Sequence, residues 1–214
     1  MMHRGAQSIV DNVSELVGRL SVVPDQLTVT GRMEGPALVF RICANIADSK
    51  RIVGRQGSTL AALKDMALLM SDEVFPGLPI DFMRVEATDA PEAGMMRTDP
   101  ASFVLEDELA RFGTYVTWCF SGSKIVLDVR NEHDAVRFIA TVHSDEQQRI
   151  TQCARALHVL MVLIGRKAGK TIYASVEAPS GGCDEADHAA RRGVRYAGPL
   201  PGEKPQQRQP ALPR

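Results

Sequence analysis

The sequence predicts an α+β protein built from two copies of one unit, each with the element order α-β-β-α-α-β. Three observations lead to this prediction. Helix-like and strand-like hydrophobic periodicities alternate along the chain, two irregular segments rich in prolines and small residues divide it, and the pattern of the first part recurs in the second. The 214 residues are 44% hydrophobic and 24% charged. These proportions are typical of a soluble globular protein and exclude collagen, a simple coiled coil and wholesale disorder.

The two irregular segments set the domain boundaries. Residues 89–101 combine prolines and small residues without periodicity, which favours a linker. Residues 179–214 hold six of the twelve prolines together with scattered arginines, and such a segment buries too little apolar surface to offset chain entropy, so we expect a disordered tail. The expected domains are therefore residues 1–88 and 102–178.

The first domain opens with a helix, because Ile9, Val13, Leu16, Val17 and Leu20 fall on one helical face. Alternating apolar residues then predict a hairpin, and two segments of helical periodicity follow it. The further elements expected here are strands over 27–30 and 37–44 joined by a turn at 31–36, a short basic helix over 48–53, a longer helix from residue 58 and a strand over 80–87.

The second domain is expected to copy the first. The apolar positions of the longer helix, which include Leu63 and Met70, recur in Cys153 and Leu160 at a constant shift of 90, which indicates an internal duplication. The segments between them are expected to form the same elements in the same order as in the first domain. The elements expected here are a helix ending at Gly113, strands over 115–120 and 124–130, a helix over 132–142, a long helix from residue 150 and a strand over 171–178.

One motif carries chemistry, the turn Gly54-Arg55-Gln56-Gly57 between two predicted helices. Two glycines remove the Cβ atoms that would keep a polyanion away from the backbone N–H groups, and the following helix directs its positive end to the same place. Lys50 and Arg51 precede the turn and can add phosphate contacts. Ile52 and Val53 offer an aliphatic floor for a base.

The segment RIVGRQGSTLAAL, at residues 51–63, resembles the signature of KH domains, and the surrounding α-β-β-α-α-β order is similar to the prokaryotic (type II) form. The resemblance implies two tandem type II KH-like units, each a three-stranded sheet with helices packed on one face. It also implies that about four nucleotides of single-stranded RNA lie in an aliphatic groove, clamped by the glycine turn. Ile42 is a further groove candidate. The residues implied to bind RNA are Lys50, Arg51, Ile52, Val53, Gly54, Arg55, Gln56, Gly57, Ser58 and Leu60.

The second copy departs from this pattern. At the corresponding place it has Ser144-Asp145-Glu146-Gln147, so both glycines are gone and two carboxylates stand where phosphates would bind. Like charges disfavour nucleic acid there. We therefore expect a degenerate KH-like unit that serves packing, a dimer contact or a protein partner, with Arg166, Lys167 and Lys170 as its own basic residues.

Two functions remain open from the sequence. The first is non-catalytic binding of single-stranded RNA, with single-stranded DNA as the open variant, in post-transcriptional regulation. The alternative is a protein-interaction scaffold whose KH folds have lost nucleic-acid binding, because residues 1–100 carry 10 basic and 13 acidic side chains. The net charge of −1 excludes a generic polycation.

Other sequence features point away from an enzyme. We find no catalytic constellation and expect no cofactor and no metal; Cys183, Asp184 and His188 form only a weak metal candidate. The segment 165–171 has three residues between its glycines instead of the four of a nucleotide loop, so we expect a capped helix end before a strand. The scattered cysteines favour a reducing compartment. With no secretory signal or membrane span expected, the predicted location is the cytoplasm.

Overall fold

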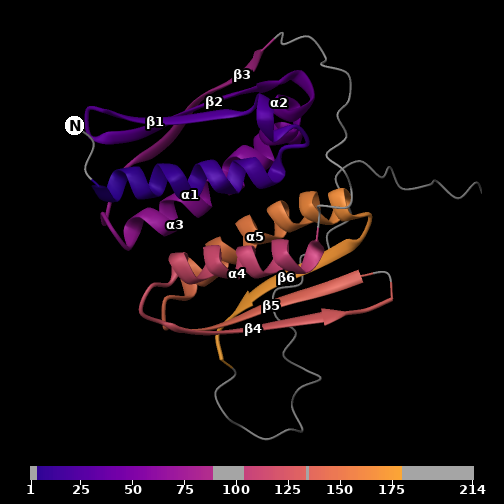
Figure 1. The fold of residues 1–214 in the computed structure, drawn as a ribbon. Helices are drawn as coiled ribbons and strands as arrows, with labels where there is room; N and C mark the ends of the chain where they lie inside the picture. The colour runs from indigo at the N-terminus through magenta and orange to yellow at the C-terminus, as the bar shows by residue number, and fades with distance from the viewer. Residues whose placement is uncertain (1–3, 89–103, 134, 180–214) are drawn as a thin grey trace, which may run out of the picture. The chain divides into compact units, whose positions relative to one another are not determined.

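The computed structural model describes residues 4–88, 104–133 and 135–179. We call residues 4–88 the first half and the described part of residues 104–179 the second half. Each half contains one three-stranded mixed sheet with helices packed on one of its faces (Figure 1), which confirms the predicted α+β class. The expected linker at 89–101 and the expected tail beyond Pro179 lie outside the described residues.

The first half follows the predicted element order. The apolar face of its first helix is buried as the periodicity requires, and the central strand buries Leu38, Phe40, Ile42 and Ala44 completely on the side of the helices. This strand pairs antiparallel with the first strand and parallel with the third. The elements are α1 (Arg4–Leu20), a 3-10 turn (Pro24–Gln26), β1 (Thr28–Glu34), β2 (Ala37–Asn45), α2 (Ile46–Val53), a 3-10 turn (Arg55–Gly57), α3 (Ser58–Asp72) and β3 (Ile80–Thr88).

The second half repeats the sheet of the first, with the same strand order and the same strand directions. The long helix and the final strand lie close to where the sequence predicts them. The elements are α4 (Leu105–Cys119), β4 (Lys124–Asn131), β5 (Ala135–His143), α5 (Gln147–Ala168) and β6 (Thr171–Glu177).

The hairpin of the second half was predicted in the wrong place. Residues 115–119, expected as a strand, are the last residues of α4, which runs through Gly113. A Cβ atom at Gly113 would come within 2.3 Å of the Leu127 side chain. The glycine therefore lets β4 approach the helix closely and does not end the helix.

The segment predicted as a helix over 132–142 is instead the central strand β5. Val136, Phe138, Ala140 and Val142 alternate along it and are all fully buried, which is the period of a strand with one face in the core. The polar residues at the start of this segment favoured the helical interpretation, but burial of the alternating side chains determines the structure.

The second half therefore has the order α-β-β-α-β and lacks a counterpart of α2. Phe40 and Phe138 occupy equivalent positions on the central strands, at a shift of 98, whereas Leu63 and Cys153 on the long helices are shifted by 90. The difference of eight equals the length of α2. Without those eight residues, Gly54–Gly57 lies opposite residues 144–147, as predicted, but there β5 passes directly into α5 without a glycine turn.

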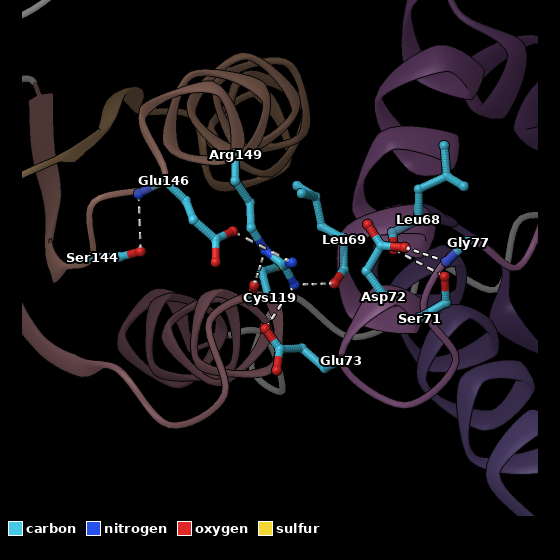
Figure 2. Close-up of polar contacts among 10 residues, drawn as sticks. All are labelled: Leu68, Leu69, Ser71, Asp72, Glu73, Gly77, Cys119, Ser144, Glu146 and Arg149. Carbon is cyan, nitrogen blue, oxygen red and sulfur yellow. Dashed lines mark hydrogen bonds and ion pairs between the residues drawn. The ribbon is translucent and has the colours of Figure 1, made fainter.

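Helices of the two halves pack against each other, chiefly α3 against α5 and α4, and their buried side chains form one hydrophobic cluster. Arg149 on α5 is the main polar contact in this interface (Figure 2). Its guanidinium donates to the carbonyl oxygens of Cys119 and Leu69, each at 2.8 Å, and to the Glu73 carboxylate at 2.8 Å. Both carbonyls lie in the last turns of helices, where no intrahelical N–H is available to them.

Helix α5 is longer than α3. At the shift of 90, the last residue of α3, Asp72, corresponds to Val162, and α5 continues for six residues beyond it. This extension, residues 163–168, carries Arg166 and Lys167 and ends at Gly169, which adopts the left-handed conformation. The predicted helix end before a strand at residues 165–171 is confirmed.

Candidate nucleic-acid interface

Helix α2 is held by a buried carboxylate. Asp48 is 1% exposed and accepts hydrogen bonds from the Ser21 hydroxyl at 2.5 Å and from the backbone N–H groups of Val22 and Val23 at 2.8 and 3.0 Å. Asn45 caps the helix by accepting from the Asp48 N–H and in turn donates to the Asp48 carboxylate. These bonds fix the start of α2 to the segment that follows α1.

The same hydrogen bonds predict a pH dependence of stability. Burial opposes ionisation of Asp48, but the hydrogen bonds from Ser21, Val22, Val23 and Asn45 hold its pKa below the ordinary value of 3.8. A carboxylate with a lowered pKa stabilises the fold above its unfolded-state pKa, and this contribution is lost as the pH falls through the folded-state pKa. We expect the free energy of unfolding to fall below about pH 5, and Asp48→Asn to reduce that slope.

Urea denaturation at a series of pH values measures this effect. The exposed Asp25→Asn, which changes the same functional group on the surface, is the matched control and is expected to keep the wild-type slope. A wild-type slope in Asp48→Asn would contradict the assignment of Asp48 as the main acid-sensitive group.

The glycine turn breaks the helix as predicted. Gly54 ends α2 with φ 73° and ψ 178°, a combination essentially confined to glycine, and its N–H donates to the Lys50 carbonyl at 2.9 Å. A Cβ atom at Gly54 would lie 2.2 Å from the Thr59 hydroxyl oxygen and 2.8 Å from the Thr59 backbone nitrogen. Gln56 and Gly57 then take left-handed conformations, with φ 53° and 78°. A Cβ atom at Gly57 would meet open space.

An open hollow of about 300 Å³ lies beside this turn. It is lined by Ser49, Lys50, Val53 and Gly54 from the end of α2 and by Val85 from β3. The floor is therefore aliphatic, and the rim carries an exposed ammonium group at Lys50. Three of the residues predicted to bind RNA, Lys50, Val53 and Gly54, come together here.

The other predicted residues divide into two groups. Arg55, Gln56 and Ser58 are exposed along the turn, which agrees with their expected place at the surface. Ile52 is fully buried and so is Ile42, so the expectation that they line a groove is wrong: both are core residues. Leu60, also implied to bind RNA, is partly buried in the first turn of α3.

Arg51 makes a different contact from the one predicted. Its Nη2 donates to the carbonyl oxygen of Leu163 on α5 at 2.9 Å, so the guanidinium reaches the second half. Burial lowers the pKa of Arg51, Asp48 opposes this change, and Arg166 adds to it. Arg51 therefore joins α2 to the extension of α5 and lies near another cation.

Two lining residues, Ser49 and Val85, were missing from the prediction. Val85 was correctly assigned to the last strand of the first half, but only the parallel pairing with β2, which sets Val85 opposite Ile42, brings it to this side of the sheet. The signal available in the sequence was the position of Val85 within an apolar strand, which does not identify the surface it faces.

The comparisons with known proteins assign no family. The sequence matches no protein-family model and is significantly similar to no curated protein. The residues and geometry of this chain are therefore the basis for assigning a function.

Within residues 4–88, 104–133 and 135–179, no three histidine, cysteine, aspartate or glutamate side chains are grouped so that they could hold a metal ion. Cys183, Asp184 and His188 lie outside these residues. In the same part of the chain, no helix combines the length and apolarity that crossing a bilayer requires.

Proposed function

We propose that the protein binds single-stranded RNA, without catalysis, at the surface formed by the Gly54–Gly57 turn and the adjoining hollow. The observation that carries this proposal is the position of the turn. It separates two helices by four residues, of which 54, 56 and 57 have positive φ, and it opens directly beside an aliphatic hollow with a cationic rim. A structural turn alone requires neither the hollow nor the cation.

The backbone of the turn suits a sugar-phosphate chain. A Cβ atom at Gly57 would meet nothing within 4 Å, so the surface there leaves room for a ligand to approach the peptide groups. The first turn of α3 begins at Ser58, and the N-terminal end of a helix favours negative charge. Phosphate oxygens are the groups that use both features.

The hollow suits a nucleobase. Val53 and Val85 present aliphatic carbon, and Lys50 adds an exposed ammonium group, so a flat ring can lie on the valines with its polar groups toward water. A volume of about 300 Å³ is at the lower end for small-molecule sites. The chain contains only 5% aromatic residues, so aliphatic contact is the available mode of base recognition.

These features agree with the KH resemblance of the first half. Its α-β-β-α-α-β order and the place of the glycine turn between α2 and α3 are those of the type II form, in which about four nucleotides are clamped at the turn. We propose a type II KH-like domain for the first half. For the second half, which has no helix corresponding to α2, we propose a related unit without a glycine turn.

A titration of fluorescent single-stranded RNA at two salt concentrations tests this function. We expect Arg55→Asp combined with Gln56→Asp to weaken binding by tenfold or more, because it puts two carboxylates beside the phosphates and removes a cation. Aspartate is among the residues that tolerate the left-handed conformation of Gln56, so the variant is expected to fold.

The matched control is Ser121→Asp combined with Lys124→Asp. It changes the net charge by the same amount at two exposed positions of the second half, and it is expected to bind RNA within about twofold of the wild type, as screening limits distant charges. Equal losses in the two variants, or no binding of RNA by the wild type, would overturn the proposal and favour a protein-interaction scaffold.

A further inference from the structure

Basic residues from both halves lie close together where α2 meets the extension of α5. Arg51, in the last turn of α2, donates to the carbonyl of Leu163. Arg166 and Lys167 follow Leu163 by three and four residues, so they occupy the same side of α5 as Leu163. Gly54 and the turn begin three residues after Arg51. The extension of α5 therefore approaches the segment that leads into the proposed RNA site.

This grouping of cations is held against electrostatic repulsion. Burial lowers the pKa of Lys167, and Arg51 and Arg19 lower it further, while Glu108 and Asp48 oppose the change. Lys167 is held in place by a hydrogen bond to the Ser21 carbonyl at 3.2 Å. Both of these acidic groups already have partners: Glu108 pairs with Arg19 at 2.9 Å, and Asp48 accepts hydrogen bonds from four donors.

Two basic residues at this end of α5 are exposed, Arg166 and Lys170. Arg166 is exposed in the last turn of α5, and Lys170 is exposed directly after Gly169. The Lys170 N–H donates to the Gly165 carbonyl at 2.9 Å, and a Cβ atom at Gly165 would come within 2.5 Å of the Lys170 carbonyl oxygen. The close approach at Gly165 keeps Lys170 next to the end of α5.

We propose that Arg166 and Lys170 extend the RNA site of the first half, by binding phosphates of nucleotides that flank those held at the Gly54–Gly57 turn. This inference rests on the proposed function. It assigns the second half a direct part in RNA binding through the end of a helix, without any glycine turn of its own. Phosphates offset the repulsion within a cluster of cations that packing holds together. Each phosphate contact also releases a counterion bound to the nucleic acid, which favours binding.

The proposal makes binding depend on RNA length. A tetranucleotide fills only the turn and the hollow, whereas a dodecanucleotide also reaches α5. We expect Arg166→Glu combined with Lys170→Glu to weaken binding of the dodecanucleotide by about tenfold and to reduce its salt slope by roughly 1.4, the value for two phosphates of a single strand. Binding of the tetranucleotide is expected to change no more than in the charge-matched control Lys124→Glu combined with Arg130→Glu.

A second variant, Arg166→Gln combined with Lys170→Gln, tests the same contacts if glutamate disturbs the end of α5. We expect its affinity for the dodecanucleotide to fall about threefold, with the same reduction in salt slope. Wild-type dodecanucleotide affinity in both variants, while the Arg55→Asp and Gln56→Asp variant still loses the tetranucleotide, would overturn this inference alone. If the wild type binds neither RNA, the proposed function fails and this inference fails with it.

Discussion

Gly54→Ala is expected to lower the free energy of unfolding by about 2–4 kcal/mol, through backbone strain at a glycine-only conformation and a clash with Thr59. The clash involves the backbone nitrogen of Thr59, 2.8 Å from the added Cβ atom, so rotation of a side chain cannot relieve it. Thr59 is 2% exposed in the first turn of α3, which leaves it little room to move. Urea denaturation measures the loss, and RNA titration of the folded fraction measures the effect on binding.

Gly57→Ala is the matched control for this change. It introduces the same methyl group three residues away, where the Cβ atom meets nothing, so only the left-handed backbone conformation is penalised, by about 1 kcal/mol. Its stability should therefore lie clearly between those of Gly54→Ala and the wild type. Equal losses in the two variants would mean that the contact with Thr59 does not define the turn.

Arg149→Ala is the second change expected to have a large effect, a loss of about 2–4 kcal/mol in the free energy of unfolding. The side chain is only 15% exposed and bonds at once to α3, α4 and the Glu73 carboxylate. Removing it leaves two carbonyls at helix ends without their charged donor, and leaves Glu73 without its cation. Denaturant unfolding followed by both fluorescence and circular dichroism reports the loss.

Arg130→Ala provides the comparison for Arg149→Ala. Arg130 is 67% exposed and pairs with Asp128 on the same strand, so its removal should leave the free energy of unfolding nearly unchanged. A similarly small loss in Arg149→Ala would show that packing of α3 on α5 holds the halves together without this polar contact.

Much of the first half could be predicted from the sequence, because its local signals agree with its packing. The apolar face of α1 and the glycines of the turn each specify one structure by a short-range rule. The second half was harder because two such signals conflict with packing there. Gly113 was read as a helix end although it permits a close approach by Leu127, and residues 132–142 begin like a helix although their alternating residues fill the core.

The candidate site shows the same division. The turn and its exposed residues follow from the spacing of Gly54 and Gly57, which is a local property. The burial of Ile52, the contact between Arg51 and Leu163, and the presence of Val85 beside the turn depend on contacts between residues far apart in the chain. A sequence pattern within one segment contains no information on which of its neighbours another helix will cover.

The different lengths of α3 and α5 are matched at one hydrogen bond between the two halves. The first half has the eight-residue helix α2 before its long helix α3. The second half has no such helix before α5, but α5 is extended by six residues. The extension contains Leu163, whose carbonyl oxygen accepts the hydrogen bond from Arg51. Arg51 lies on α2, the helix without a counterpart in the second half. The short helix of the first half and the extended helix of the second half are thus complementary at this contact. Removing α2 and shortening α5 would therefore each abolish the same hydrogen bond, so the lengths of these two helices depend on each other.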